Sequence, residues 1–221
     1  MKLYYSPGAC SLAPHILLCE AKLPHTLIKV DTGTHLTEDG IDFYTINPKG
    51  CVPVLELDDG QRLSEGPIIA QFIADHARRD DLMPGAGSMA RYRVMEWQNY
   101  ITSELHKSFS PLFNPALNAA AKAVFAAILS EKFAWVSRQL RGKSYLTGDS
   151  FSAADAYLFT VAGWANHVGL DLSDQDADVF GPLQAFLARV AARAAVQEAM
   201  KAEGLPAAER SKPCAAQHRE C

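Results

Sequence analysis

The sequence lacks any uninterrupted apolar run near the roughly 18 residues of a membrane span. It also lacks a signal-peptide pattern, because residues 4–8 (YYSPG) break the apolar run near the start. No block of five like charges occurs, and the formal net charge is only −4. These absences argue against a membrane partner and against a nucleic-acid partner.

Cysteine is scarce and odd in number, with five in 221 residues. Together with the missing signal pattern, this favours free thiols in a reducing cytoplasm. Cys10 is followed by Ser11-Leu12-Ala13, so it has the start of a CxxC motif but no second thiol. Such a site can form a mixed disulfide with another molecule but cannot close an internal one.

The apolar pattern divides the chain into two halves of different kind. The first half is predicted to alternate strands at 2–6, 25–31, 52–57 and 61–64 with helices at 11–22 and 65–76. After it, strand patterns vanish and helices are predicted at 88–110, 117–141, 152–168 and 179–203. The expected fold class is therefore α/β plus all-α.

Turn-forming residues and polarity place the boundaries between these parts. Residues 1–78 form the predicted α/β domain, 79–87 a linker by composition, and 88–203 the helical domain. Residues 204–221 are polar and aperiodic, and a mobile tail is expected there. That tail carries Cys214 and Cys221, whose reactivity the sequence does not reveal.

Cys10 stands between a predicted strand and a predicted helix. Four roles are open to it: ordinary packing, metal binding, half of a redox pair, or a thiol aimed at a substrate. A helix N-terminus stabilises a thiolate, which favours the last role. His15 and Cys19 lie four residues apart on the same helix, but no second ligand pair accompanies them, so no metal is expected.

Two further motifs in the first half could bind a ligand. Pro53 begins a predicted strand, where it marks either a plain edge or a cis bend. A cis bend would free the Val52 backbone for an extended, peptide-like ligand. Ser64, Glu65 and Gly66 start a helix, whose free N–H groups suit a carboxylate while Glu65 suits an ammonium; simple capping is the alternative.

Two motifs stand out in the helical half. Asn99, Ser103, His106 and Lys107 share one face of an α-helix at their spacing, which is either solvated or turned toward the cleft with Cys10. Ser152 and Asp155 have the spacing of a capping box, which indicates a buried helix start and no catalytic role.

Taken together, these motifs resemble the cytosolic glutathione transferases, and specifically the bacterial beta class. The resemblance covers residues 1–203 in order and rests on YYSPGACSLAPHI, NPKGCVPVL, LSEGP, ITSELHKSFSPLF and FSAADAYLFT. It implies a thioredoxin-like N-terminal domain joined to a helical C-terminal domain. It also implies a homodimer that takes glutathione as co-substrate, with no metal.

The resemblance also implies roles for individual residues. Cys10, Ser11 and His106 would be catalytic, and Cys10 would face the glutathione sulfur. Val52, before a cis Pro53, would pair with the cysteinyl unit, and Glu65 and Gly66 would hold the γ-glutamyl end. The remaining glutathione-site residues would be His35, Asn99, Ser103, Glu104, His106 and Lys107, with Glu104 reaching across the dimer. Phe109, Pro111, Phe113, Trp164 and His167 would line a pocket for a small hydrophobic electrophile.

His35 departs from the family pattern, where lysine is common, so its contact with the glycyl carboxylate would be weaker or pH-dependent. The expected activity is conjugation of the glutathione thiolate to such electrophiles. Cys10 would either help to ionise glutathione or hold it as a mixed disulfide, giving thiol-transfer or reductive activity. The alternative is a non-enzymatic interaction module built on the same scaffold.

Overall fold

The computed structural model describes residues 1–172 and 177–206. Its N-terminal half contains a five-stranded mixed sheet with the order β3-β2-β1-β4-β5. The strands are β1 (Lys2–Tyr5), β2 (Thr26–Asp31), β3 (Leu36–Thr37), β4 (Val54–Glu56) and β5 (Arg62–Ser64). β1 is parallel to β2 and antiparallel to β4, so the helix between β1 and β2 makes the crossover that parallel strands need.

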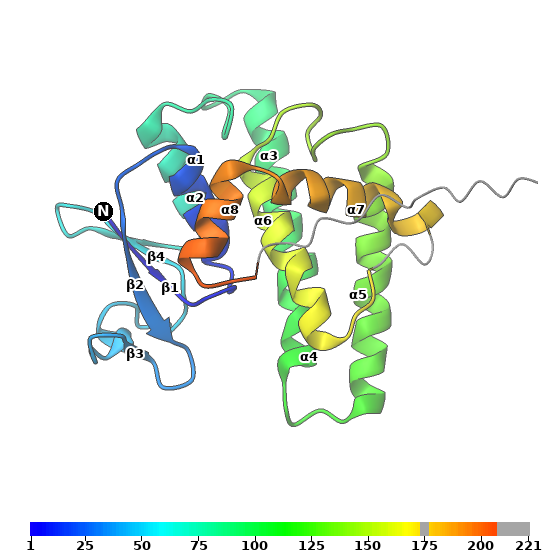
Figure 1. Cartoon of the computed structure of the whole chain (residues 1–221), viewed down its shortest axis with the longest axis horizontal. Coiled ribbons are helices and arrows are strands. Elements are labelled where there is room, and N and C mark those ends of the chain that lie inside the picture. Colours follow the sequence, from blue (N-terminus) through cyan, green and yellow to red (C-terminus); the bar gives the residue numbers. More distant parts are fainter. Residues whose placement is uncertain (173–176, 207–221) are drawn as a thin grey trace, which may run out of the picture.

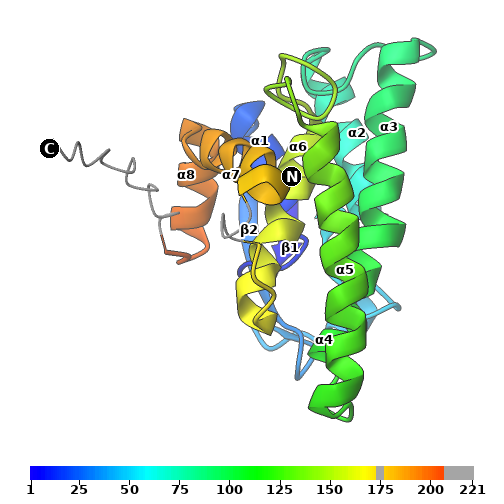
Figure 2. The ribbon, with the colours of Figure 1, turned by 90° about the vertical axis from the view of Figure 1, so that its right-hand side faces the viewer.

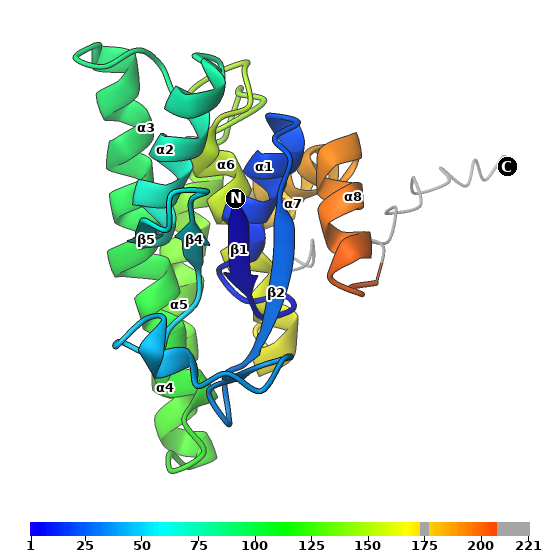
Figure 3. The same ribbon diagram turned by 90° about the vertical axis from the view of Figure 1, so that its left-hand side faces the viewer.

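That crossover helix is α1 (Leu12–Glu20), and α2 (Gly66–Ala77) follows β5. Both helices lie behind the sheet in Figure 3. α1 also contacts α6 (Ala153–Ala162) and α8 (Ala194–Ala202), so it lies between the sheet and the helical half. Every residue from Leu12 to Leu18 is buried, as expected for a helix that is covered on all sides.

The helical half surrounds α6, as Figures 1 and 2 show. Its other α-helices are α3 (Met89–Tyr100), α4 (Ser110–Phe113), α5 (Ala119–Gln139) and α7 (Ala177–Ala191). Short 3-10 segments occur at Phe43–Thr45, Lys107–Phe109 and Gly163–Val168.

The predicted capping box at the start of α6 is confirmed. Ser152 donates to the Asp155 carboxylate through both its N–H and its hydroxyl, each at 2.7 Å. Leu146 N–H donates to the other carboxylate oxygen at 2.8 Å. Asp155 is fully buried, so these bonds fix the start of α6 inside the protein.

The prediction of one regular helix over 88–110 is wrong. α3 ends at Tyr100 and continues as a π-helical segment, Ile101–His106, and then as the 3-10 segment Lys107–Phe109. A π-helix widens the turn, so side chains beyond Tyr100 leave the face that α-helical spacing assigns to them. This change falls on the segment predicted to line the active site.

Three other element predictions need correction. The helix predicted over 152–168 changes to 3-10 geometry at Gly163. The helix predicted over 179–203 is two helices, because Arg193 adopts extended backbone (φ −70°, ψ 135°) and its guanidinium pairs with Glu20 of α1. The two-residue strand β3 was not predicted, because it lies in a polar stretch with no apolar alternation.

The tail prediction falls mainly outside the described residues, since residues 207–221 are not among them, and Cys214 and Cys221 fall there. Within the described part, no single helix is long and apolar enough to cross a membrane. The pair Asp178–Ala191 and Ala194–Ala202 together meets the length and composition test, but is bent by 76°.

Candidate active site

Cys10 directly precedes Ser11, the N-cap residue of α1, as the sequence predicts. Its Sγ donates a hydrogen bond to the Val52 carbonyl oxygen at 3.2 Å. Burial raises the pKa of the Cys10 thiol to about 12, and the backbone N–H groups of Cys10 and Ser11 offset only part of that effect. Burial therefore outweighs the helix N-terminus, which by itself favours a thiolate, and the neutral thiol of Cys10 is the favoured form.

Ser11 is fully buried and its hydroxyl is already engaged. The hydroxyl donates to Ser6 O and accepts from Ser6 N–H, both at 3.2 Å. These bonds close the loop that carries Cys10. Ser11 was expected to be catalytic, and its group that acts on the Cys10 sulfur is the backbone N–H, since its hydroxyl is engaged within the loop.

The Val52–Pro53 peptide bond is cis, which decides between the two alternatives left by the sequence. Both residues precede β4, which begins at Val54. Within the described part of the chain, the Val52 N–H makes no backbone hydrogen bond. Its carbonyl oxygen accepts the hydrogen bond from the Cys10 sulfur, so the Val52 backbone lies directly opposite Cys10 in the site.

Glu65 caps α2 with its backbone in the left-handed half of conformational space, at φ 71°. A non-glycine residue in such a conformation is uncommon and is often found at functional sites. Its carboxylate is 63% exposed and pairs with the Lys49 ammonium at 2.5 Å. Lys49 also donates to Ser64 Oγ at 2.8 Å. Among the described residues, a methyl group at Gly66 would meet no atom within 4 Å, so there is open space beside this residue at the start of α2.

His106 ends the π-helical segment and is held by two aromatic side chains. Its Nδ1 lies 2.7 Å from the hydroxyl of Tyr157, and its ring meets Trp164 edge-on at 4.7 Å. Burial, followed by the charge of Lys107, lowers the pKa of His106, against the opposing effect of Glu65. His106 is therefore a neutral imidazole with a fixed ring.

Cys10, Glu65, His106 and Tyr157 lie close enough for their charges to affect one another's pKa values. The charge of Glu65 acts on Cys10, on His106 and on Tyr157, and the pKa of Tyr157 is raised, first by burial and then by Cys10 and Glu65. The structure thus brings together the N-terminus of α1, the start of α2 and the π-helical segment. Such a set offers a sulfur, an acid, a neutral imidazole and free backbone N–H groups.

Sequence comparison assigns this arrangement to a family. Residues 8–76 match the family described as glutathione S-transferase, N-terminal domain, and residues 115–189 match glutathione S-transferase, C-terminal domain. The chain belongs to the glutathione S-transferase family. Glutathione S-transferase GstA of Escherichia coli O157:H7 is 44% identical over 205 residues, which are 93% of this chain and 100% of that protein.

Solved structures agree with this assignment. A beta-class glutathione S-transferase of Sphingomonas chungbukensis is 42% identical with a TM-score of 0.87, over 93% of this chain and 100% of that one. A sphingomonad glutathione S-transferase in complex with glutathione is 43% identical with a TM-score of 0.86, again over 93% and 100%. The predicted class, fold and transferase activity are thereby confirmed.

The other predicted site residues of the transferase's helical half differ in their exposure and in their partners. Ser103 donates to Asn99 O at 3.1 Å, and Asn99, Ser103 and Lys107 are exposed. Glu104 pairs with Lys132 of α5 at 2.9 Å, and this contact lowers the pKa of Glu104. Glu104 therefore already has a partner in its own chain, which the expectation of a contact across a dimer did not include.

His35 lies in the loop between β2 and β3 with a positive φ of 56°. Its ring packs on Tyr44 at 4.6 Å, and its Nδ1 is buried with no hydrogen-bond partner among the described residues. A side chain at Gly50 would clash with Tyr44 and crowd His35. The two rings therefore pack closely against Gly50, in the segment that leads to Val52. The structure places His35 beside that segment.

The predicted pocket residues are partly assembled. Trp164 meets Phe109 at 5.4 Å and Phe113 at 6.1 Å, both edge-on, and Phe113 is 51% exposed. Pro111 belongs to α4, and His167 is exposed in the 3-10 segment after α6. Phe109 is only 1% exposed, so it supports the pocket from behind and does not line it. The accessible aromatic surface is formed by Phe113 and Trp164 and continues to the His106 ring.

Two residues of the site were missed from the sequence, Tyr157 and Lys49. Tyr157 follows Asp155 by two positions, so the capping box that fixes α6 also fixes its hydroxyl near His106. Lys49 lies in the polar stretch before Val52, where the sequence shows no pattern that pairs it with Glu65.

Proposed function

We propose that this transferase conjugates glutathione to small hydrophobic electrophiles in the site between Cys10, Glu65 and His106. The observation that carries the proposal is the contact between the Cys10 sulfur and the Val52 carbonyl at 3.2 Å. It puts a sulfur beside a strand-entry backbone whose N–H is free of backbone partners in the described chain. A cysteinyl peptide that pairs with Val52 would bring its own sulfur next to Cys10.

The remaining groups match the charges of the tripeptide. Glu65 would receive the ammonium of the γ-glutamyl unit in place of Lys49, and the α-carboxylate would bind the free N–H groups at the start of α2 beside Gly66. His35 and Lys107 are the candidates for the glycyl carboxylate. Exchange of one cation for another at Glu65 keeps that carboxylate neutralised while glutathione is bound.

Cys10 acts in this proposal as a hydrogen-bond donor and not as a base. With a pKa of about 12 it holds its proton at neutral pH. On glutathione binding, its S–H would turn from the Val52 carbonyl to the glutathione sulfur. The Ser11 backbone N–H would donate to the same sulfur, and both bonds would favour the thiolate of glutathione. The alternative role, attack by a Cys10 thiolate to form a mixed disulfide, is disfavoured by the same burial.

His106 completes the reaction centre. Tyr157 keeps its proton because its pKa is raised. In this proposal its hydroxyl donates to His106 Nδ1, which would leave the proton of the neutral ring on Nε2. The glutathione thiol gives its proton to solvent, its sulfur forms a bond to the electrophilic carbon, and the leaving group departs with the bonding electron pair. The N–H of His106 would stabilise the negative charge that develops in this step.

The electrophile would rest on Phe113 and Trp164, with the buried ring of Phe109 packed behind them. Phe113 is exposed enough to contact it directly, and Trp164 connects that surface to His106. An apolar, flat molecule fits such a lining.

We further propose a homodimer in the cytoplasm, made of a glutathione-binding domain (1–78), a linker (79–87) and a helical domain (88–203). Asn99 and Ser103 lie exposed on the segment that would border the glutathione site. Glu104 would reach a partner chain only by leaving Lys132. Sedimentation equilibrium of the full chain tests the dimer.

The direct test of the activity is the rate of conjugation between glutathione and a chlorodinitrobenzene-type electrophile. We expect a rate above the uncatalysed one that saturates in both reactants. The interaction-module alternative predicts no rate enhancement and no binding of glutathione by calorimetry. Binding without conjugation across a panel of electrophiles would support a binding protein over an enzyme.

A further inference from the structure

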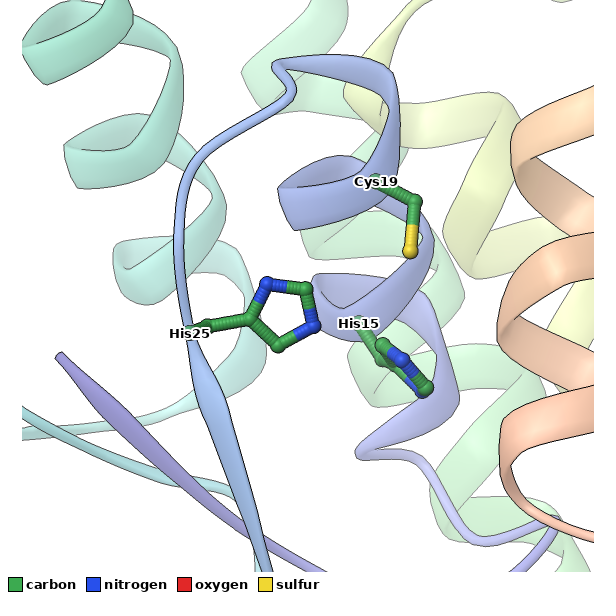
Figure 4. A group of neighbouring side chains, drawn as sticks. All are labelled: His15, Cys19 and His25. Carbon is green, nitrogen blue, oxygen red and sulfur yellow. The ribbon is translucent and has the colours of Figure 1, made fainter.

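A second cluster of reactive side chains lies along α1, outside the proposed reaction centre. His15 and Cys19 come from α1, and His25 comes from the residue just before β2. One ring nitrogen of each histidine and the Cys19 sulfur all lie within 4.8 Å of one another. Figure 4 shows the Cys19 sulfur and the His25 ring both directed toward His15.

Each histidine is fixed by a hydrogen bond from its Nδ1. His15 Nδ1 lies 2.8 Å from Glu203 Oε1, and both side chains are almost completely buried, at 1% and 0% exposed. His25 Nδ1 lies 2.8 Å from the Leu23 carbonyl oxygen. Because a carbonyl can only accept, Nδ1 is the protonated nitrogen in the neutral form of His25, which makes Nε2 the ligand atom. The same tautomer of His15 suits the Glu203 carboxylate, which leaves a lone pair on its Nε2 as well.

Glu203 is itself held in place. Its second carboxylate oxygen accepts from the Gly8 N–H at 2.9 Å, and it lies at the C-terminal end of α8. A carboxylate or carbonyl behind a histidine is the usual arrangement behind metal-binding imidazoles. The charges of Glu198, Glu20 and Glu203 all reach Cys19, so the surroundings favour a cation.

We propose that His15, Cys19 and His25 bind one Zn²⁺-class ion. Two imidazole nitrogens and one thiolate suit zinc and disfavour the oxygen-seeking ions Mg²⁺ and Ca²⁺. Ligand atoms around tetrahedral zinc are about 3.5 Å apart, so the cluster would close by roughly 1 Å when the ion binds. The Cys19 proton passes to solvent as the metal–sulfur bond forms, and water takes the fourth position.

The ion would connect α1 to the start of β2 across the turn between them. Neither Cys19 nor His25 is placed in the reaction centre, so we expect a structural ion that raises stability by binding only the folded state. This inference is independent of the proposed activity.

Cobalt is the probe for the site, because a thiolate ligand gives Co²⁺ a near-ultraviolet charge-transfer band. The full chain is used with Cys51, Cys214 and Cys221 replaced by serine, which leaves Cys10 and Cys19 as the thiols. We expect one Co²⁺ per chain, release of one proton, a charge-transfer band, and loss of that band when Zn²⁺ is added. In the same background, Cys19→Ser should abolish the band, and the matched thiol control Cys10→Ser should keep it.

His25→Asn provides a second variant that leaves the buried part of α1 intact. We expect at least tenfold weaker Co²⁺ binding, and loss of the rise in melting temperature that Zn²⁺ gives to the parent chain. Absence of the band in the parent, its survival in Cys19→Ser, or a Zn²⁺-induced rise that is unchanged in His25→Asn would each overturn the proposal. Circular dichroism of every variant confirms that loss of binding is not loss of folding.

Discussion

The indole Nε1 of Trp164 donates a hydrogen bond to the carbonyl oxygen of Gly8 at 2.8 Å. Trp164 follows α6 in the helical half, and Gly8 lies in the loop that ends at Cys10. The same indole ring packs edge-on against His106. The Trp164 side chain thus holds in place both the loop that carries Cys10 and the imidazole of His106.

Replacing Trp164 with phenylalanine tests this connection. The variant keeps an aromatic ring but loses the bond to Gly8, so we expect the free energy of unfolding to fall by about 1 kcal/mol. Conjugation should fall as well, because the Cys10 loop loses its support. Trp135→Phe, at a 38% exposed position in α5, is the matched control. Equal effects of the two variants on both quantities would contradict the connection. Chemical denaturation and steady-state kinetics measure them.

Tyr157→Phe tests the orientation of His106. The change removes the hydroxyl 2.7 Å from His106 Nδ1 and leaves the ring in place. We expect kcat to fall about tenfold, equivalent to about 1.4 kcal/mol of transition-state stabilisation, with the KM for glutathione nearly unchanged. Tyr145→Phe removes a buried hydroxyl that contacts Arg193, away from Cys10, and serves as the control. If kcat is the same in both variants, His106 does not depend on Tyr157.

Glu65→Gln tests recognition of the glutathione ammonium. A neutral amide cannot replace the carboxylate as partner of a cation, so we expect the KM for glutathione to rise about tenfold or more. The KM for the electrophile should stay as it was. Glu96→Gln, which breaks an exposed pair with Arg93, is the control for loss of surface charge. An unchanged KM for glutathione would place the ammonium elsewhere.

Asp155 makes stability depend on pH. Burial outweighs its hydrogen bonds and raises the pKa of Asp155 to about 6, above an unfolded value of about 3.9. The folded state therefore binds the proton more tightly, so this contribution to stability is complete below pH 4 and is lost as pH rises through 6. Between pH 4 and 7 the free energy of unfolding of the natural chain should fall by about 2–3 kcal/mol relative to Asp155→Asn.

Urea denaturation at each pH measures this difference. Because both chains share every other titrating group, the comparison isolates Asp155. A difference that is constant between pH 4 and 7, or one that grows with pH, would show that the Asp155 carboxyl is not raised in pKa by folding.

Local patterns were sufficient to predict much of the fold. The alternation around β1, β2 and β4 and the capping box at Ser152 each depend on neighbours in sequence, and the structure has them where expected. The π-helical turn at Ile101–His106 and the break at Arg193 were not predictable in this way. Arg193 breaks the helix while paired with Glu20, 173 residues away along the chain.

In the site, too, features set by neighbours in sequence were predictable, and features set by distant residues were not. Cys10 and Glu65 are found from helix starts, which the sequence marks directly. The pKa of Cys10 could not be predicted from the sequence, because burial by distant segments outweighs the local helix N-terminus. His25 was not joined to His15 and Cys19, because the sequence does not show that the turn after α1 folds back on the helix.

The central claim is that the transferase activates glutathione with Cys10 as a neutral donor. The most direct measurement is conjugation of glutathione to a chlorodinitrobenzene-type electrophile by the natural chain and by Cys10→Ala, side by side. Loss of one hydrogen-bond donor is worth about 1–1.5 kcal/mol, so we expect the variant to keep conjugation within about tenfold of the natural chain. Complete loss of conjugation in Cys10→Ala alone would contradict this account and make the Cys10 thiolate the centre of the chemistry.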